Sequence, residues 1–256
     1  MGTQYLLDSS FTNLAFEQDI VHLLYKGVRG LNTISNETPE KLIERIVLLE
    51  KHMKGSILLA ISEVVDELST GLTLLNNNCR FIAVLREKSY HERKKHKHNV
   101  ELEEGSEETF ELIRSYADKM YAFIRRLQNK DPRLNFNEHQ HEIYKSLVEF
   151  LATQESPIKK WKEERKIVYG ETDSIRDISQ TDKKLAATGV TLAYDSPITV
   201  LTRDQNIKLY LTAVIKEYSE GILHLSIPSN PITIENELYE HRISFTNASS
   251  TSASVQ

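Results

Sequence analysis

The chain has 256 residues, of which 39% are hydrophobic and 27% are charged, a composition typical of a soluble protein with a substantial core. Its formal net charge of −5 excludes a uniformly basic surface, and its longest apolar runs are far too short to cross a bilayer. The first residues carry no basic region or cleavage-site pattern, and Cys79 is the only cysteine, which excludes an internal disulfide. We therefore expect a cytoplasmic protein with no membrane partner.

The first third of the chain predicts strands that alternate with helices. Tyr5–Leu7 is apolar and leads into the polar Asp8-Ser9-Ser10, which is typical of a short buried strand that ends in a turn. Ile57–Ile61 predicts a second buried strand, and Ser62 caps the helix that follows it. Helical periodicity predicts two further helices between these strands, over 14–28 and 39–53.

The middle of the chain has a different character. Residues 91–108 are charged throughout and predict an exposed loop, which includes the basic run Arg93–His98. A long helix is expected from Ser106, with a narrow apolar seam suited to a helical hairpin or to a partner helix. The seam comprises Phe110, Ile113, Ala117, Met120, Ile124 and Leu127. Asp131-Pro132 ends this helix, and a second helix is predicted over 139–151.

The alternating pattern returns after residue 165. Helices are predicted over 182–194 and 205–218, and strands over 198–201 and 222–227. Strands that alternate with helices imply an α/β fold with a mainly parallel sheet flanked by helices. We expect residues 1–84 and 166–246 to form this domain, 85–165 to form a helical insertion, and 247–256 to form a disordered tail.

Four acidic residues stand where a functional site is expected. In an open α/β sheet the functional crevice lies beyond the carboxyl ends of the strands. Asp8 and Asp204 follow predicted strands, and Glu67 lies in the helix after the second strand. Asp182 begins a helix whose dipole favours an anion. The four carboxylates could therefore converge on one edge of the sheet.

Carboxylates that lie close together favour the binding of a divalent cation. Neighbouring carboxylates resist ionisation unless a cation offsets their charge, and hard oxygen ligands suit Mg²⁺ or Mn²⁺. Such cations activate water and stabilise a leaving oxygen, which is the logic of phosphodiester hydrolysis. The hypothesis requires the carboxylate oxygens to approach closely enough to share an ion.

Each acid also has a plain structural interpretation. Asp8 is placed to cap the helix after it, and Glu67 stands beside Asp66, so one of that pair is expected to be only a solvated helix residue. Asp182 has the same rival role as a helix-start residue, with Asp173 and Asp177 nearby. Only the joint placement of the four acids favours a catalytic site.

Four segments resemble the motifs of the PIN-domain nuclease family. Leu6–Ser10 resembles the opening strand with its acid and small hydroxyl residue, and Ile61–Leu68 resembles the second motif, in which a Glu-Leu pair follows a helix start. Thr181–Thr188 is similar to the third motif, an Asp that leads into a small-residue helix. Leu201–Ile207 is similar to the fourth, with its Thr and Asp. The resemblance covers roughly residues 4–80 and 170–227 and leaves the helical middle outside.

The resemblance implies a metal-dependent nuclease that cleaves single-stranded RNA. Asp8, Glu67, Asp182 and Asp204 would hold Mg²⁺ or Mn²⁺, directly or through water, and a metal-activated water would attack phosphorus. Ser10 and Thr202 would orient carboxylates or contact a phosphate. Asp66 would point away from the site.

Two alternatives remain open. The chain could be a catalytically silent PIN-like scaffold that binds RNA or protein, with its helical insertion contacting a protein partner or a second copy of the chain. It could also be the toxin of a toxin–antitoxin pair, although the long insertion makes that role less attractive.

Overall fold

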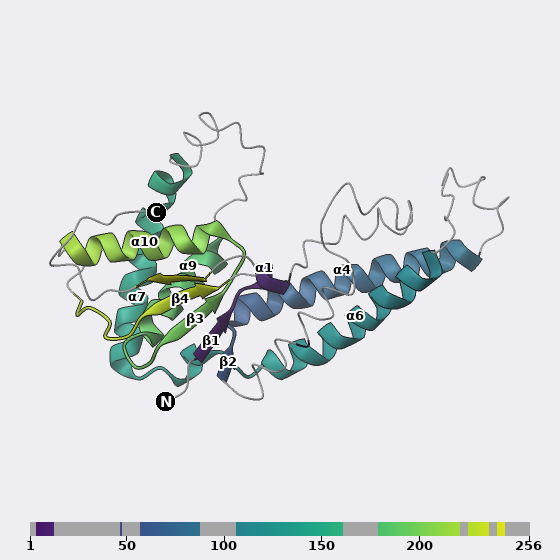
Figure 1. The fold of residues 1–256 in the computed structure, drawn as a ribbon, viewed down its shortest axis with the longest axis horizontal. Helices are drawn as coiled ribbons and strands as arrows, with labels where there is room; N and C mark the ends of the chain where they lie inside the picture. The colour runs from purple at the N-terminus through teal and green to yellow at the C-terminus, as the bar shows by residue number, and fades with distance from the viewer. Residues whose placement is uncertain are drawn as a thin grey trace. The chain divides into compact units, whose positions relative to one another are not determined.

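A computed structural model describes residues 4–12, 47, 57–87, 106–160, 179–220, 225–235 and 240–243 (Figure 1). The helices predicted over 14–28 and 39–53, the basic run and the tail lie outside these residues, apart from the helical Val47. The chain divides into two compact units. Unit 1 comprises Met1–Phe11, Ser56–Ile61 and Asp131–Gln256, and unit 2 comprises Thr12–Gly55 and Ser62–Lys130.

Unit 1 contains a five-stranded sheet in the order β2-β1-β3-β4-β5. Its strands are β1 (Gln4–Leu7), β2 (Ile57–Leu59), β3 (Ile198–Leu201), β4 (Ile232–Glu235) and β5 (Glu240–Ile243). The pairs β1–β2, β1–β3 and β3–β4 are parallel, and β5 runs antiparallel to β4. This architecture confirms the predicted α/β fold with a mainly parallel sheet.

β1 and β3 each have a neighbouring strand on both sides, and their most deeply buried residues are apolar. Leu6, Leu7, Val200 and Leu201 are at most 1% exposed, as expected for a parallel sheet that is covered by other elements. Leu7 of β1 is paired with Leu201 of β3. The residues that follow these two strands therefore emerge at the same edge of the sheet.

One predicted strand is wrong in its position. Residues 225–227, the described part of the strand expected over 222–227, are not in a strand, and the fourth strand is β4 instead. The turn before β4 contains Pro228 and Pro231, which cannot donate to a ladder and therefore delay the strand. Ile232 and Ile234 of β4 are buried, whereas Thr233 and Glu235 are partly exposed.

Among the described residues of unit 1, the longer helices are α7 (Glu138–Thr153), α9 (Gln180–Leu192) and α10 (Gln205–Glu220). α9 packs against β3, α7 and α10. α10 also contacts α7. α9 packs on the sheet at Gly189, where a Cβ would meet Val200 Cγ2 at 3.5 Å and Leu6 Cδ2 at 3.7 Å, which are ordinary van der Waals distances. The helix α7, which the sequence analysis placed in the insertion, thus belongs to the α/β unit.

Unit 2 is built on the pairing of α4 (Ser62–Glu87) with α6 (Ser106–Leu127), which lie side by side (Figure 1). The described part of the predicted seam, Ala117, Met120, Ile124 and Leu127, is buried, so a helical hairpin accounts for it. Tyr116 extends this core, and its hydroxyl donates to the carbonyl of Thr12 at 3.3 Å. Thr12 ends α1 (Ser9–Thr12), which follows β1.

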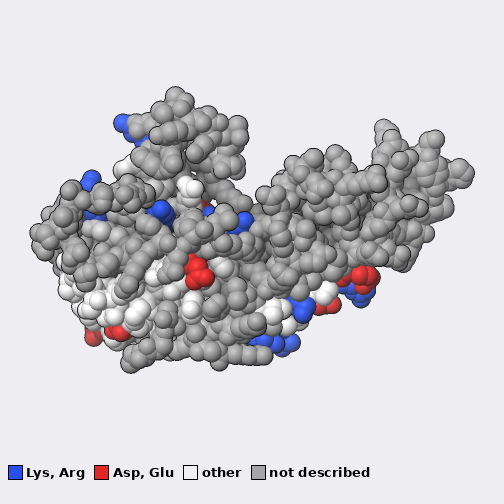
Figure 2. Space-filling model, viewed as in Figure 1, with Lys and Arg blue, Asp and Glu red and all other residues white. Residues whose placement is uncertain are grey.

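The visible surface carries charges of both signs. On the face in Figure 2, the basic and acidic side chains of the described residues are interspersed with uncharged ones and form no large patch of a single sign. In the described part of the chain, every helix is too short or too polar to cross a bilayer.

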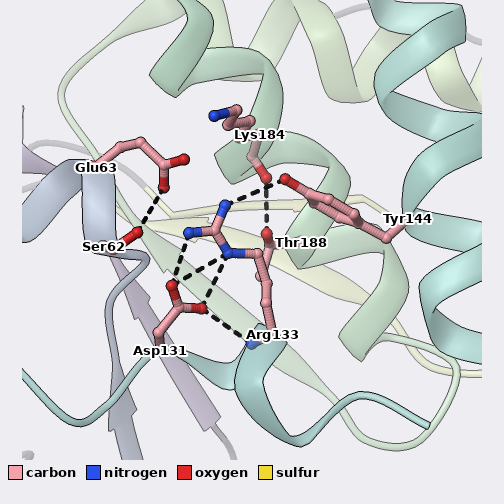
Figure 3. Close-up of polar contacts among 7 residues, drawn as sticks. All are labelled: Ser62, Glu63, Asp131, Arg133, Tyr144, Lys184 and Thr188. Carbon is pink, nitrogen blue, oxygen red and sulfur yellow. Dashed lines mark hydrogen bonds and ion pairs between the residues drawn. The ribbon is translucent and has the colours of Figure 1, made fainter.

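A compact polar motif leads from unit 2 into α7. Asp131 caps the short 3₁₀ helix η3 (Pro132–Asn135) by accepting from the backbone N–H of Arg133 at 3.0 Å. The Arg133 guanidinium returns to the same carboxylate at 2.7 Å and donates to the Tyr144 hydroxyl at 3.2 Å (Figure 3). Asn137 and Gln140 then form a capping box at the start of α7. These bonds fix the direction in which α7 begins.

Candidate functional site

Asp8 lies at the carboxyl end of the sheet, directly after β1. Its backbone N–H donates to the carbonyl of Leu201 at 3.0 Å, which continues the pairing of β1 with β3 by one residue. Only 3% of Asp8 is exposed. The fold therefore forces a carboxylate into a buried position between the ends of two adjacent parallel strands.

Two hydroxyl groups hold this carboxylate. Ser10 Oγ and Thr202 Oγ1 both donate to Asp8 Oδ2, the latter at 2.7 Å. Each hydroxyl in turn accepts a backbone N–H, from Arg203 at 2.9 Å and from Asp204 at 2.9 Å respectively. Because a hydroxyl has one proton, these acceptor contacts leave both protons directed at Asp8. Both hydroxyls thus contact the Asp8 carboxylate, and their orienting role in a reaction stays a prediction.

Asp182 is fixed at the start of α9 by a reciprocal cap. Its backbone N–H donates to Ser179 Oγ at 3.1 Å, and its Oδ2 accepts the backbone N–H of Ser179 at 3.1 Å. The carboxylate is buried, with 7% of the residue exposed. The helix-start role considered for Asp182 is therefore real, and it orients the carboxylate that the nuclease hypothesis requires.

Asn206 connects Asp182 to Asp204. Its amide Nδ2 donates to Asp182 Oδ2 at 3.2 Å and approaches Asp204 Oδ2 at 3.4 Å, while its backbone N–H donates to Asp204 Oδ1 at 2.7 Å. Asn206 is fully buried. The sequence analysis missed this residue because it searched for acids, although a polar side chain two positions after Asp204 in the first turn of a helix was a usable signal.

Asp8, Asp182 and Asp204 are hereafter called the acidic cluster. The side-chain hydrogen bonds that hold Asp8 and Asp182, described above, end on Oδ2. The Oδ1 atoms of these two carboxylates receive none of these bonds, whereas Asn206 contacts both oxygens of Asp204.

The charges of the cluster act on one another. The pKa of Asp8 is raised from 3.8 to about 7, mainly by burial and to a smaller extent by the charges of Asp182 and Asp204, while the hydrogen bonds from Ser10 and Thr202 lower it. Burial also raises the pKa of Asp182, and the charge of Asp204 adds to this increase. Near neutral pH the cluster therefore favours any cation that offsets its negative charge.

The fourth predicted acid belongs to the other compact unit. Glu67 lies in α4 and is exposed, as is its neighbour Asp66. The contacts of the acidic cluster described above involve residues of unit 1 only. The assignment of Glu67 as a metal ligand, and the orientation expected for Asp66, remain predictions.

Carboxylate oxygens are the ligand type that a hard divalent cation prefers, but the three acids do not surround a single point. Among the described residues, no group of three or more His, Cys, Asp or Glu side chains is arranged to hold one ion. Mg²⁺ is commonly bound through one or two carboxylates, with waters and substrate phosphates completing its coordination. The Oδ1 atoms of Asp8 and Asp182, which accept none of the hydrogen bonds described above, would be the ligands of such an ion.

No family model matches the chain, and comparisons with curated proteins and with solved structures also find no match.

Proposed function

We propose that this protein is a PIN-like nuclease that hydrolyses phosphodiester bonds, with single-stranded RNA as its substrate and Mg²⁺ or Mn²⁺ as its cofactor. One observation carries the proposal: the acidic cluster lies at the carboxyl ends of adjacent parallel strands, with hydroxyl and amide donors holding it and two carboxylate oxygens left available. The carboxyl ends of parallel strands are where α/β proteins bind their ligands.

The side chains have distinct roles in this proposal. Asp8, Asp182 and Asp204 hold the cation, with Glu67 as a fourth acid, and the cation supplies a water of lowered pKa and charge neutralisation for the phosphate. Ser10 and Thr202 keep the Asp8 carboxylate in one orientation. Asn206 keeps Asp182 and Asp204 together despite their repulsion. These bonds prearrange the site, so that little reorganisation is needed when substrate binds.

Neutralising single acids tests the site. We expect Asp8→Asn and Asp182→Asn each to lower Mn²⁺-dependent cleavage of a labelled single-stranded RNA by at least about 100-fold, because loss of even an outer-shell partner lowers activity by about 10- to 100-fold. Glu67→Gln is expected to lower it as well. Asp118→Asn changes an exposed acid of α6 and should leave cleavage unchanged.

Full activity in both Asp8→Asn and Asp182→Asn would refute the proposed site, provided that chelation of the metal abolishes cleavage by the wild-type protein. Full activity in Glu67→Gln alone would remove Glu67 from the site and leave the acidic cluster in place. A single-stranded DNA of the same sequence, assayed in parallel, distinguishes the two nucleic acids.

A second candidate function is binding without cleavage. It is favoured by the lack, among the described residues, of three acidic side chains arranged around one ion. On this hypothesis the purified protein binds RNA but does not cut it with either Mg²⁺ or Mn²⁺, and Asp8→Asn leaves the RNA affinity unchanged.

A further inference from the structure

A lysine is buried near the start of α9. Lys183 directly follows Asp182 in this helix, and only 1% of Lys183 is exposed. A buried ammonium group loses its hydration, and near the N-terminus of a helix the dipole also opposes its positive charge. A methionine or leucine would fill the same position without either cost, so the charge of Lys183 requires an explanation.

Glu155 supplies the partner of this charge. Its carboxylate accepts from Lys183 Nζ and forms an ion pair with it. Glu155 directly follows Gln154, the C-cap of α7, and lies in a turn that the Ile158 N–H closes by donating to the Gln154 carbonyl at 3.0 Å. Ile158 is buried, so burial and a hydrogen bond both restrict this turn. The ion pair therefore connects the end of α7 to the start of α9.

The ion pair is better suited to fixing geometry than to adding stability. Removing two opposite charges from water costs free energy that their attraction offsets only in part, so apolar residues of similar volume are often as stabilising or more so. An ion pair, however, is satisfied only when its two groups meet, whereas apolar side chains tolerate small shifts. The Lys183 side chain is 2% exposed and the Glu155 side chain 33%, so the lysine cannot turn to water instead.

The part of α9 that the ion pair anchors also carries the Asp182 carboxylate. Ser179 and Asn206 fix this carboxylate relative to α9 and α10, and the ion pair adds a fixed point at the end of α7, which packs against α9. We propose that Lys183 and Glu155 are positioning residues, whose ion pair fixes the start of α9 and thereby the place of Asp182 in the acidic cluster. The effect on cleavage rests on the proposed nuclease function, whereas the anchoring of α9 does not.

Native-state hydrogen exchange of the metal-free protein, measured by NMR, tests the anchoring. Lys183→Met/Glu155→Leu replaces the ion pair with apolar side chains and leaves neither charge buried alone. We expect the backbone N–H of Asp182, which donates to Ser179 Oγ at 3.1 Å, to exchange about tenfold faster or more, because the start of α9 opens more often. The backbone N–H of Gln140, which donates to the corresponding cap of α7 at 2.9 Å, is the internal control and should exchange at the wild-type rate.

Exchange of the Asp182 N–H at the wild-type rate would overturn the proposal, and so would an equal increase at Gln140, which would indicate a general loss of stability. Glu155→Gln is the second variant if the apolar variant does not fold, since it alters only the partly exposed partner. The same increase confined to Asp182 is expected, and its absence would again overturn the proposal.

Cleavage assays test the consequence for the reaction. We expect Lys183→Met/Glu155→Leu to lower Mn²⁺-dependent RNA cleavage by about tenfold or more and to raise the Mn²⁺ concentration for half-maximal cleavage. Lys145→Met/Glu149→Leu removes the exposed ion pair of α7 by the same substitutions and should change neither quantity.

The two assays separate the possible failures. Cleavage at the wild-type rate by a variant whose Asp182 N–H exchanges faster would refute the effect on the reaction and leave the anchoring in place. Absence of cleavage by the wild-type protein would instead refute the proposed function. The exchange measurement would still decide the anchoring, because it needs neither metal nor substrate.

Discussion

At the scale of single residues, Asp8 has the most unusual chemistry. Its almost complete burial and the negative charges of the other two acids disfavour its ionised form. The hydrogen bonds that Ser10 and Thr202 donate to one of its oxygens favour the ionised form. The balance favours the protonated form up to about pH 7. Once deprotonated, this carboxylate carries a buried charge that destabilises the fold and that a bound cation would offset.

This balance predicts how stability depends on pH. Between about pH 4 and pH 7 the folded protein holds the Asp8 proton and the unfolded chain does not, so the free energy of unfolding falls as pH rises through this window. The contribution of Asp8 is on the order of 4 kcal/mol, since each unit of pKa shift corresponds to about 1.4 kcal/mol. Asp8→Asn removes the titration but retains an oxygen for Ser10 and Thr202.

We therefore expect metal-free Asp8→Asn to match the wild-type protein near pH 4 and to be more stable at pH 8. Urea denaturation at constant ionic strength from pH 4 to pH 8 measures the difference, and Asp118→Asn serves as the exposed control. The same stability for wild type and Asp8→Asn at pH 8 would show that the buried charge carries no penalty.

The sequence could predict the acids of the cluster but not the groups that hold them together. Asp8 and Asp204 follow recognisable strands, and Asp182 starts a recognisable helix, so topology alone brings them to one sheet edge. Asn206 gives no such signal, because an amide in the first turn of a helix has common structural explanations. Its contact with Asp182 depends on the packing of α10 against α9, which a single sequence does not specify.

At the scale of elements, two helix N-termini converge on the acidic cluster. Asp182 lies in the first turn of α9, and Asp204 immediately precedes α10 and accepts the backbone N–H of Asn206. The positive ends of the two helix dipoles offset part of the negative charge, each by about 0.3–1 kcal/mol. The same residues that cap helices are the proposed metal ligands, so the two interpretations of these acids are compatible.

Two helix caps in unit 1 allow the structural and functional roles to be separated. Ser179→Ala and Asn137→Ala each remove a capping side chain, from α9 and from α7, and each should lower the free energy of unfolding by about 1 kcal/mol. Only Ser179 also holds the Asp182 carboxylate. We expect RNA cleavage to fall in Ser179→Ala and to be retained in Asn137→Ala, as measured by urea denaturation and cleavage assays on the same samples. Equal cleavage by the two variants would mean that the α9 cap has no part in activity.

At the scale of the whole molecule, the strands were predicted as well as their apolar content allowed. β3 is buried throughout, Leu6–Leu7 of β1 and Leu58–Leu59 of β2 are buried, and all three strands were expected near their observed positions. β4 alternates buried and partly exposed residues, which made it less conspicuous than the apolar residues near 222–227. β5 has the polar sequence Glu-His-Arg-Ile, whose strand structure depends on pairing with β4 rather than on its own pattern.

Metal binding should stabilise the folded protein as a whole. A ligand that binds only the folded state adds about 2.7 kcal/mol to the free energy of unfolding at a concentration one hundred times its dissociation constant. We expect Mn²⁺ at pH 8 to raise the thermal midpoint of the wild-type protein, and chelation to reverse the shift. Asp8→Asn, which lacks one proposed ligand, should show a much smaller shift. Equal shifts in the two proteins would place the Mn²⁺ elsewhere on the molecule.

The order of the strands has a consequence during synthesis on the ribosome. β1 pairs with β3, and the hydrogen bond from Thr202 to Asp8 joins residues 194 positions apart. A nascent chain therefore carries Asp8 long before the segment that contains Thr202, Asp204 and Asn206 has been translated. The proposed nuclease site therefore cannot assemble beside its own messenger RNA before that segment has been synthesised.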